Sequence, residues 1–495
     1  MYKEIFVQVA EDETEVAVLE EGKLVEIYVE REPDKRLIGN IYKGIVKNVL
    51  PGMQAAFVDI GLEKNAFLYV DDALSNSIWQ DRKNGYDQIE GIKPNIRDII
   101  KEGQEIVVQI AKEAVGSKGA RVTTQLTVPG RYLVLMPYVD YIGISKRIES
   151  EQERERLKGI AEEIKPEQVG IIIRTVAEGA SREDLEQDLE SLVKICGRIK
   201  QRAKQISAPA VIHKDLELIQ RILRDVFDSD VQKLSVNNSA VFDKVIDYLE
   251  VMDVSLKSRV FLSDTENLFQ KHAVDLEIEQ ALKRKVWLKN GGYLVIDEME
   301  ALTAIDVNTG KYVGSTDLAD TVFWTNAEAA KEIGRQLRLR NIGGIVVVDF
   351  IDMKNSEHQE EILRILEEAV RTDKMKVHIL GITQLGLVEM TRKKARNSLS
   401  SMLERICPYC EGKGKILSEE SVSIRLLKEL REKAALFSTD TFIVSAHPAV
   451  NKIIYSAKRN KNIPIDEQLG IQIQFKDKEE NLIGEYNIEP VYRQQ

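Results

Sequence analysis

Residues 302–308 read LTAIDVN and residues 343–349 read GGIVVVD, and these two stretches decide how the centre of the chain folds. Each is a short apolar run with an aspartate at or near its end, which is typical of a buried strand. A helical pattern over about 316–340 follows the first, and another over about 356–372 follows the second. Strands that alternate with helices in this way predict a parallel α/β sheet within residues 281–402.

Three oxygen-bearing side chains fall at the ends of these strands. Asp306 and Asn308 are two positions apart, so they point to one face of their strand, and Asp349 closes the second strand. Ligands of open α/β sheets gather at the carboxyl ends of strands, and carboxylate and amide oxygens suit Mg²⁺. A single aspartate here would usually be a turn residue or a helix cap, but three matched positions favour a catalytic metal site. Asp352 is expected to face away from it.

Basic residues flank both strand ends in the sequence. They are Lys331, Arg335, Arg338 and Arg340 before the second strand, and Arg392, Lys393, Lys394 and Arg396 at the start of the next expected helix. Such runs are usually solvated helix faces. Beside a metal site they predict a groove that holds phosphate groups.

The composition of the chain excludes several classes of protein. Its 495 residues, 43% of them hydrophobic, are enough for three or four structural units at roughly 100–200 residues each. No apolar run approaches the roughly 18 residues of a membrane span, and the N-terminus has no secretory pattern. The net charge of −11 argues against a broadly basic surface but allows local basic grooves. We expect a cytoplasmic protein with no membrane segment.

Two regions before residue 210 have patterns of their own. Short strands with turn residues over 36–124 predict a small barrel of the OB type. Two phenylalanines on successive strands, with lysines nearby, would either stack on nucleic-acid bases or fill the barrel core, and the pattern leaves both open. The residues concerned are Phe57, Phe67, Lys43 and Lys112.

Over 125–209 the pattern changes to strands and charged helices. Ser181 and Asp184 form a capping box that predicts a helix start. Arg174 and Thr175 follow an apolar strand, where the planar guanidinium suits a phosphate, although an arginine at a strand end is usually just solvated.

The three cysteines are Cys196, Cys407 and Cys410, a sparse and odd number that fits a reducing compartment. The last two form a CPYC sequence followed by EGKG, which is typical of half a zinc knuckle. Tetrahedral zinc needs four ligands, so His378 or Cys196, or the same pair from a second chain, would have to complete the site. A redox dithiol and a tight turn with incidental thiols are the alternatives.

Taken together, these motifs resemble the bacterial ribonuclease E/G family, from residue 1 to about residue 415. They occur in the family's order and at compatible spacing. They are AAFVD at 55–59, IRT at 173–175, LTAIDVN at 302–308, RQLRLR at 335–340, GGIVVVDFIDM at 343–353 and CPYC at 407–410.

The resemblance implies a multidomain α/β and α+β fold in which an S1-type barrel of the OB class is inserted in an RNase H-like unit. The implied parts are the split RNase H-like unit (1–35 and 210–280), the S1 barrel (36–124), a 5′-sensor unit (125–209), a DNase I-like α/β catalytic unit (281–402), a zinc link (403–415) and a small C-terminal domain (416–495).

The resemblance also implies a Mg²⁺-dependent endoribonuclease that cuts single-stranded, AU-rich RNA and leaves a 5′-phosphate on the downstream product. Asp306 and Asp349, helped by Asn308, would hold the catalytic Mg²⁺. The other implied roles are RNA binding for Phe57, Phe67 and Lys112, sensing of a 5′-monophosphate for Arg174 and Thr175, and a structural Zn²⁺ shared between subunits for Cys407 and Cys410. Lys43 is added to the RNA-binding set.

The implied partners are rRNA precursors and mRNA, and a second or further copy of the chain in a homodimer or homotetramer. Residues 416–495 match the family only loosely, and no long Arg/Pro-rich tail follows them. We therefore expect the short form of the family, with no scaffold for other RNA-decay enzymes and no membrane-attaching helix. A non-catalytic S1-type RNA-binding or ribosome-associated protein is the alternative, and a DNA-directed nuclease is a third interpretation.

Overall fold

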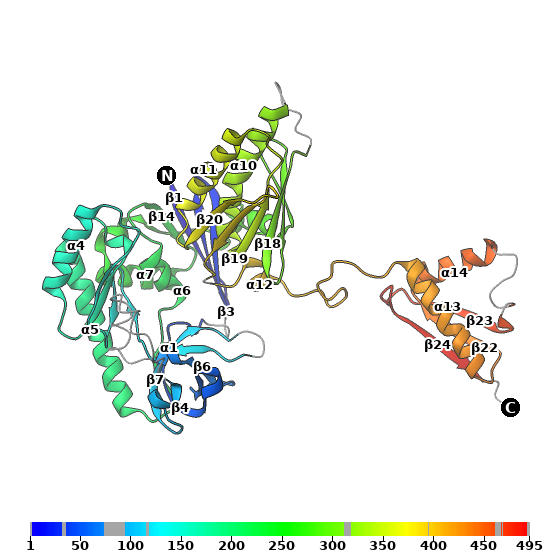
Figure 1. Ribbon diagram of the computed structural model, residues 1–495, viewed down its shortest axis with the longest axis horizontal. Coiled ribbons are helices and arrows are strands. Elements are labelled where there is room, and N and C mark those ends of the chain that lie inside the picture. The colour runs from blue at the N-terminus through cyan, green and yellow to red at the C-terminus, as the bar shows by residue number, and fades with distance from the viewer. Residues whose placement is uncertain are drawn as a thin grey trace. The chain divides into compact units, whose positions relative to one another are not determined.

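The computed structural model describes residues 2–31, 36–73, 95–114, 118–310, 318–394, 396–460, 467 and 469–492. The chain divides into two compact units, residues 1–402 and 403–495, and each is considered by itself. Figure 1 shows the helices and strands of both. In the part of the chain that the structure describes, no helix is long and apolar enough to cross a membrane.

The first unit contains a closed β-barrel of five strands. β4 pairs with β5 on one side and with β7 on the other, so the order β4-β5-β6-β8-β7 closes on itself. Alternate residues such as Val58, Leu68 and Val108 fill its core. The small barrel predicted from the short strands is thus confirmed. Its strands and short helices are β4 (Ile41–Leu50), β5 (Ala55–Asp59), β6 (Ala66–Tyr69), β7 (Glu105–Lys112), β8 (Arg121–Thr123), α1 (Val70–Ala73) and α3 (Ile96–Ile99).

A second sheet joins segments from both sides of the barrel in the sequence. β1 pairs in parallel with β14, more than 200 residues later, and β1, β2 and β3 follow one another as antiparallel neighbours. Helices α6 and α7 pack on it through a common apolar core. Its elements are β1 (Lys3–Val9), β2 (Glu13–Glu20), β3 (Lys23–Arg31), α6 (Leu218–Asp225), β14 (Val231–Val236), α7 (Ser239–Met252), β15 (Val260–Leu262), α8 (Leu268–Lys271) and α9 (Val274–Leu282).

Residues between the last barrel strand, β8, and helix α6 form a four-stranded sheet with two long helices. Ser181 caps α5 and exchanges hydrogen bonds with Asp184, which confirms the predicted capping box. The strand β13 that follows α5 adds to the barrel strand β4. The elements are β9 (Val128–Pro129), β10 (Leu133–Met136), β11 (Ile142–Ile144), α4 (Glu151–Ile164), β12 (Gly170–Ile173), α5 (Arg182–Gln205) and β13 (Ala210–His213).

The last sheet of the first unit has six strands in the order β16-β17-β18-β19-β21-β20. Among these described strands β18 and β19 are parallel and the remaining neighbours are antiparallel, so the predicted parallel arrangement is confirmed for this pair and wrong for the rest of the sheet. Helices α10 and α11 pack on one face of it (Figure 1). The elements are β16 (Lys285–Trp287), β17 (Tyr293–Glu298), β18 (Leu302–Asn308), α10 (Leu318–Leu339), β19 (Gly344–Asp349), α11 (Ser356–Arg371), β20 (Val377–Ile382), β21 (Val388–Arg392) and α12 (Leu399–Leu403).

The arginines at the end of α10 and in β21 do not form the predicted groove at the carboxyl ends of these strands. Arg338 is 7% exposed and pairs with the carboxylates of Glu20 and Glu26. Arg392 ends β21, opposite Gly344 at the start of β19, and pairs with buried Asp373. The C-terminal end of α10 leads into the start of β19, so these arginines lie at the edge opposite the end of β19. Their role is to bind carboxylates inside the protein.

The prediction for the other members of that basic set is also wrong in part. Arg335 pairs with Glu332 and Glu277, and the Arg340 side chain donates to the Lys283 carbonyl. No helix begins at Arg392, since the next helix is α12.

The second unit consists of a three-stranded sheet and two helices. β22 lies between β23, to which it is parallel, and β24, to which it is antiparallel. Apolar residues of the helices and strands form one core. The elements are α13 (Glu419–Leu436), β22 (Thr441–Ala446), α14 (Pro448–Asn460), β23 (Gln472–Asp477) and β24 (Tyr486–Val491).

Candidate functional site

The two predicted catalytic aspartates lie side by side at the carboxyl ends of the central strands β18 and β19 of the six-stranded sheet. We call this end of the two strands the acidic edge. In the parallel pair of β18 and β19, the register places Asp306 directly beside Asp349. Neighbouring strands are about 4.8 Å apart, so both carboxylates can reach one ion. Their inward neighbours Ile305 and Val348 are buried in the core, whereas both aspartates are exposed on the opposite face. The sequence therefore brings these two residues together as predicted.

Asn308, the third predicted residue of this site, orients the carboxylate of Asp306. The Asn308 side-chain amide donates to Asp306 Oδ2 at 2.8 Å. The pKa of Asp349 is raised, first by partial burial and then by the negative charges of Asp306 and Asp352. Asp352 was expected to face away, but its charge acts on Asp349. Crowded carboxylates of this kind are stabilised by a bound cation.

The oxygen donors fit Mg²⁺. Among the described residues, no group of three or more His, Cys, Asp and Glu side chains is close enough to hold a metal ion. Asp306 and Asp349 supply two carboxylates, and Asn308 supplies an amide oxygen. Mg²⁺ is usually bound by one or two carboxylates and keeps several waters and phosphate oxygens, so this donor set is sufficient.

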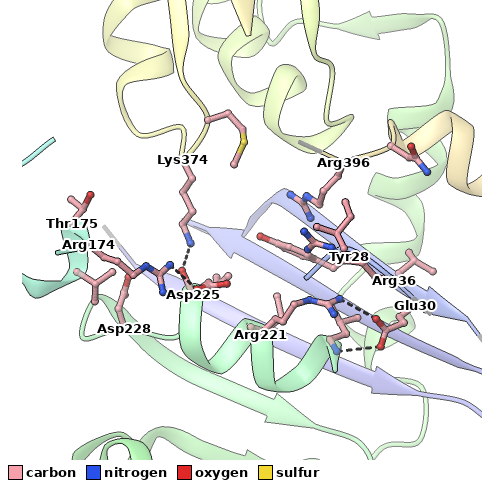
Figure 2. Close-up of a pocket in the computed structure, with 18 of the residues that line it drawn as sticks. Tyr28, Glu30, Arg36, Arg174, Thr175, Arg221, Asp225, Asp228, Lys374 and Arg396 are labelled. Carbon is pink, nitrogen blue, oxygen red and sulfur yellow. Dashed lines mark hydrogen bonds and ion pairs between the residues drawn. The ribbon is translucent and has the colours of Figure 1, made fainter. Parts of the chain in front are cut away.

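Arg174 and Thr175 line a cavity of about 1400 Å³ in the first unit, shown in Figure 2. Arg174 donates to the Gly130 carbonyl and to Asp225 Oδ1, both at 2.6 Å. The Thr175 hydroxyl lies 2.8 Å from that of Ser145. Both predicted sensor residues thus sit at one wall of a hollow rather than on an open surface.

Several charged residues of this cavity were missed by the sequence analysis. Lys374 donates to the Asp225 carbonyl at 2.9 Å, so it and Arg174 both bind Asp225, as Figure 2 shows. Burial acts to raise the pKa of Asp225, but hydrogen bonds and charge from Arg224 and Arg174 lower it overall. Lys374 and Asp225 come from distant segments, so no local motif could have indicated them. Arg396, which the sequence analysis named in its basic set, also lines the cavity and stacks on the Tyr28 ring at 4.0 Å.

The predicted RNA-binding residues of the barrel form a row on its outer face. Phe57 pairs with Phe67, Phe67 with Arg121, and Arg121 with Lys112 on four successive strands. The two phenylalanine rings are 5.4 Å apart in an edge-to-face arrangement. Neither is in the barrel core, so the open question between core and surface is answered in favour of the surface.

Two further residues qualify this row. Tyr69 was missed, although its ring lies 4.3 Å from that of Phe67 and beneath the Arg121 guanidinium at 4.8 Å. Lys43 lies apart from the row, since its ammonium donates to the Ile206 carbonyl at 2.9 Å and pairs with Glu105 at 2.8 Å.

In the second unit, Cys407 and Cys410 occupy a turn before α13. Hydrogen bonds from the backbone amides of Cys410 and Tyr409, and from the Cys410 thiol, lower the pKa of Cys407. Lowered thiol pKa values favour metal binding, because the thiolate is the ligand. Cys196 is buried in the first unit, where burial raises the pKa of its thiol to about 11, so it is a poor candidate for a further ligand.

Comparisons with known proteins agree with this arrangement. The model of the ribonuclease E/G family matches residues 127–395, and that of its thioredoxin-like domain matches residues 406–491. Ribonuclease G of Salmonella typhimurium and that of Escherichia coli K12 are each 40% identical, over 100% of this chain and 99% of theirs. Ribonuclease E of a Nostoc species is 40% identical over 82% of this chain and 58% of its own length.

The two aspartates at the ends of β18 and β19 fall within the part of the chain that matches the ribonuclease E/G family model. The chain belongs to the ribonuclease E/G family, which confirms the resemblance drawn from its motifs. Membership makes it an endoribonuclease. The prediction that residues 416–495 match the family only loosely is wrong, because the thioredoxin-like domain of the family covers 406–491.

Proposed function

We propose that the protein is a Mg²⁺-dependent endoribonuclease that hydrolyses single-stranded, AU-rich RNA. The observation that carries the proposal is the register of β18 and β19, which pairs Asp306 with Asp349 on the exposed face. Water attacks the phosphorus atom and the bond to the 3′-oxygen breaks. The upstream product keeps a 3′-hydroxyl group, and the downstream product carries a 5′-phosphate.

Each acidic-edge residue has a separate task in this proposal. Asp306 and Asp349 hold the ion from neighbouring strands, and Asn308 fixes the orientation of the Asp306 carboxylate through its 2.8 Å hydrogen bond. Bound Mg²⁺ supplies positive charge to a phosphoryl oxygen and lowers the pKa of the attacking water. Because the aspartates stand on an exposed sheet face, a flexible strand of RNA can reach them from solvent.

The barrel row and the cavity are proposed to hold the rest of the RNA. Aromatic rings stack on unpaired bases and cations follow the phosphates, which suits Phe57, Phe67 and Lys112. Arg174 and Thr175 would bind a 5′-monophosphate in the cavity of Figure 2. Because Lys43 is already paired with Glu105, we assign it a weaker role in RNA binding.

The proposal extends to assembly and cellular role. Cys407 and Cys410 supply two thiolates, so a tetrahedral Zn²⁺ would be completed by the same pair of a second chain, in a homodimer or homotetramer. We further propose a cytoplasmic enzyme that acts on rRNA precursors and mRNA.

Removal of divalent metal provides the direct test. Purified protein incubated with an end-labelled single-stranded RNA is expected to release shorter products with Mg²⁺ and none with EDTA, and added Mg²⁺ should restore cleavage. The downstream product should be a substrate for a 5′-monophosphate-dependent exonuclease. Cleavage that persists in EDTA would contradict the metal mechanism, and binding without cleavage under all conditions would favour a non-catalytic RNA-binding protein. A DNA strand of the same sequence distinguishes a DNA-directed nuclease.

Arg174→Ala is expected to slow cleavage of 5′-monophosphorylated RNA about tenfold or more, since a hydrogen bond to a charged group contributes about 1.5–3 kcal/mol. Cleavage of the triphosphorylated RNA should change much less. The measurement is the ratio of initial rates on the two substrates. Arg182→Ala, which removes an exposed arginine of α5, is the matched control. Equal slowing of both substrates would remove Arg174 from any sensor.

A further inference from the structure

A row of side chains leads from the acidic edge across the exposed face of the six-stranded sheet. The register pairs Asn308 with Tyr293 on β17, and Tyr293 with Trp287 on β16. Residues paired in this way lie on the same face of a sheet. With strands about 4.8 Å apart, Trp287 stands roughly 10 Å from Asn308. The next row of the same face contains Lys285 and, two strands away, Asp306.

Trp287 and Tyr293 form an aromatic pair under a single cation. Their ring centroids are 5.3 Å apart at an angle of 63°. The Lys285 ammonium lies 4.0 Å from the Trp287 centroid and 3.4 Å from that of Tyr293. Trp287 is nevertheless 61% exposed. A large aromatic surface with a cation over it, open to solvent beside an acidic edge, combines the two groups that bind unpaired nucleotides.

We propose that Trp287, Tyr293 and Lys285 form a nucleobase subsite that seats one unpaired base of the RNA next to the scissile phosphate. The inference rests on the proposed function, because it places the base beside Asp306 and Asp349. The base stacks on the exposed Trp287 ring, and the Lys285 ammonium binds a phosphate that flanks the base. Every base has a π-face, so the subsite selects single-stranded RNA over duplex but not one sequence over another.

The charge pattern supports a nucleotide rather than an apolar partner. Two carboxylates at the edge repel phosphates, whereas Lys285 stands in the same row as Asp306 and extends its ammonium over the aromatic pair. Lys285 would thus bind the RNA backbone beside the acidic edge, and bound Mg²⁺ would neutralise the carboxylates of Asp306 and Asp349. A second copy of the chain that covered Trp287 would be the other occupant, and the test separates the two.

The test uses the full chain and a set of single-stranded oligonucleotides with one abasic position moved along each side of the cut. In the wild type, one abasic position should raise KM about 10- to 100-fold, as expected for loss of one stacked base, with little change in kcat. Trp287→Ala should show the raised KM with every oligonucleotide, and its KM should no longer depend on where the abasic position lies. Trp287→Phe should keep the response.

Trp324→Ala is the matched control. Trp324 is also 61% exposed and packs edge-to-face on Phe323 at 5.3 Å, but it lies on α10, which covers the other face of the sheet. Its removal should leave KM and the abasic response unchanged.

Binding without catalysis separates this inference from the proposed function. In Mg²⁺-free buffer, a single-stranded oligonucleotide should quench part of the tryptophan fluorescence of the wild type and of Trp324→Ala, but not of Trp287→Phe. If the wild type binds with this quenching and never cleaves, the proposed function fails and the subsite stands. If Trp287→Ala behaves like Trp324→Ala, or if it lowers the oligomeric mass and retains the abasic response, the subsite is refuted.

Discussion

Asp349→Asn is expected to lower the cleavage rate at least about 10³-fold, because metal catalysis contributes several kcal/mol and each 1.36 kcal/mol is a factor of ten. Asp306→Asn should have a similar effect. The two carboxylates are the only pair that the register of β18 and β19 brings together at this edge among the described residues. An amide keeps the size of the side chain but removes the charge that holds Mg²⁺. Single-turnover rates at saturating RNA measure the effect directly.

RNA affinity gives this experiment its second readout. Because Asp306 and Asp349 repel each other and would repel phosphate, either substitution should leave the dissociation constant for RNA unchanged or slightly lower. Binding is measured in EDTA so that no cleavage occurs. Asp297→Asn is the control, since Asp297 stands on the same sheet at the opposite end of β17 and pairs with Arg284. Cleavage rates within tenfold of the wild type in both Asp306→Asn and Asp349→Asn would exclude this metal site.

The local parts of the site were predictable from the sequence because they depend on short-range geometry. Asp306 and Asn308 share a face by the alternation of a strand, and a strand-helix-strand crossover brings Asp349 beside Asp306. The capping box at Ser181 is likewise a matter of three residues. None of these features depends on where distant segments pack.

The errors arose where distant segments decide the outcome. From the sequence, Arg338 was expected to be a cation that binds phosphate. In the structure, β2 and β3 place Glu20 and Glu26 against α10, and Arg338 pairs with both carboxylates. The parallel sheet became mixed because β17 and β21 return as antiparallel neighbours, which periodicity does not reveal. Burial of an arginine requires paired carboxylates, and the partners here are more than 300 residues away.

The aromatic residues show the same limit in another form. Alternation could not tell whether Phe57 and Phe67 face the barrel core, since either face of a barrel strand can carry a phenylalanine. The register and the buried alanines beside them place both rings outside. Arg121 joins the row only because β8 pairs with β6, which the sequence pattern does not reveal.

Cys407→Ser is expected to abolish Zn²⁺ binding and to convert the oligomer to smaller species. A structural zinc site contributes on the order of 10 kcal/mol of binding free energy, and a site built from two thiolates per chain exists only while two chains remain together. Removal of one thiolate from each chain leaves two ligands where four are needed. Metal content by elemental analysis and mass by sedimentation measure the two effects in the same sample.

The fold of the second unit should survive this change, because its core is formed by α13, α14 and the three-stranded sheet rather than by the cysteine turn. Far-ultraviolet circular dichroism therefore remains close to that of the wild type. Cys196→Ala, which removes a buried thiol of α5, should alter neither metal content nor mass. An unchanged oligomer that still holds zinc after Cys407→Ser would refute the shared site. Loss of zinc without a change in mass would place the metal within one chain and assign the subunit contact to another surface.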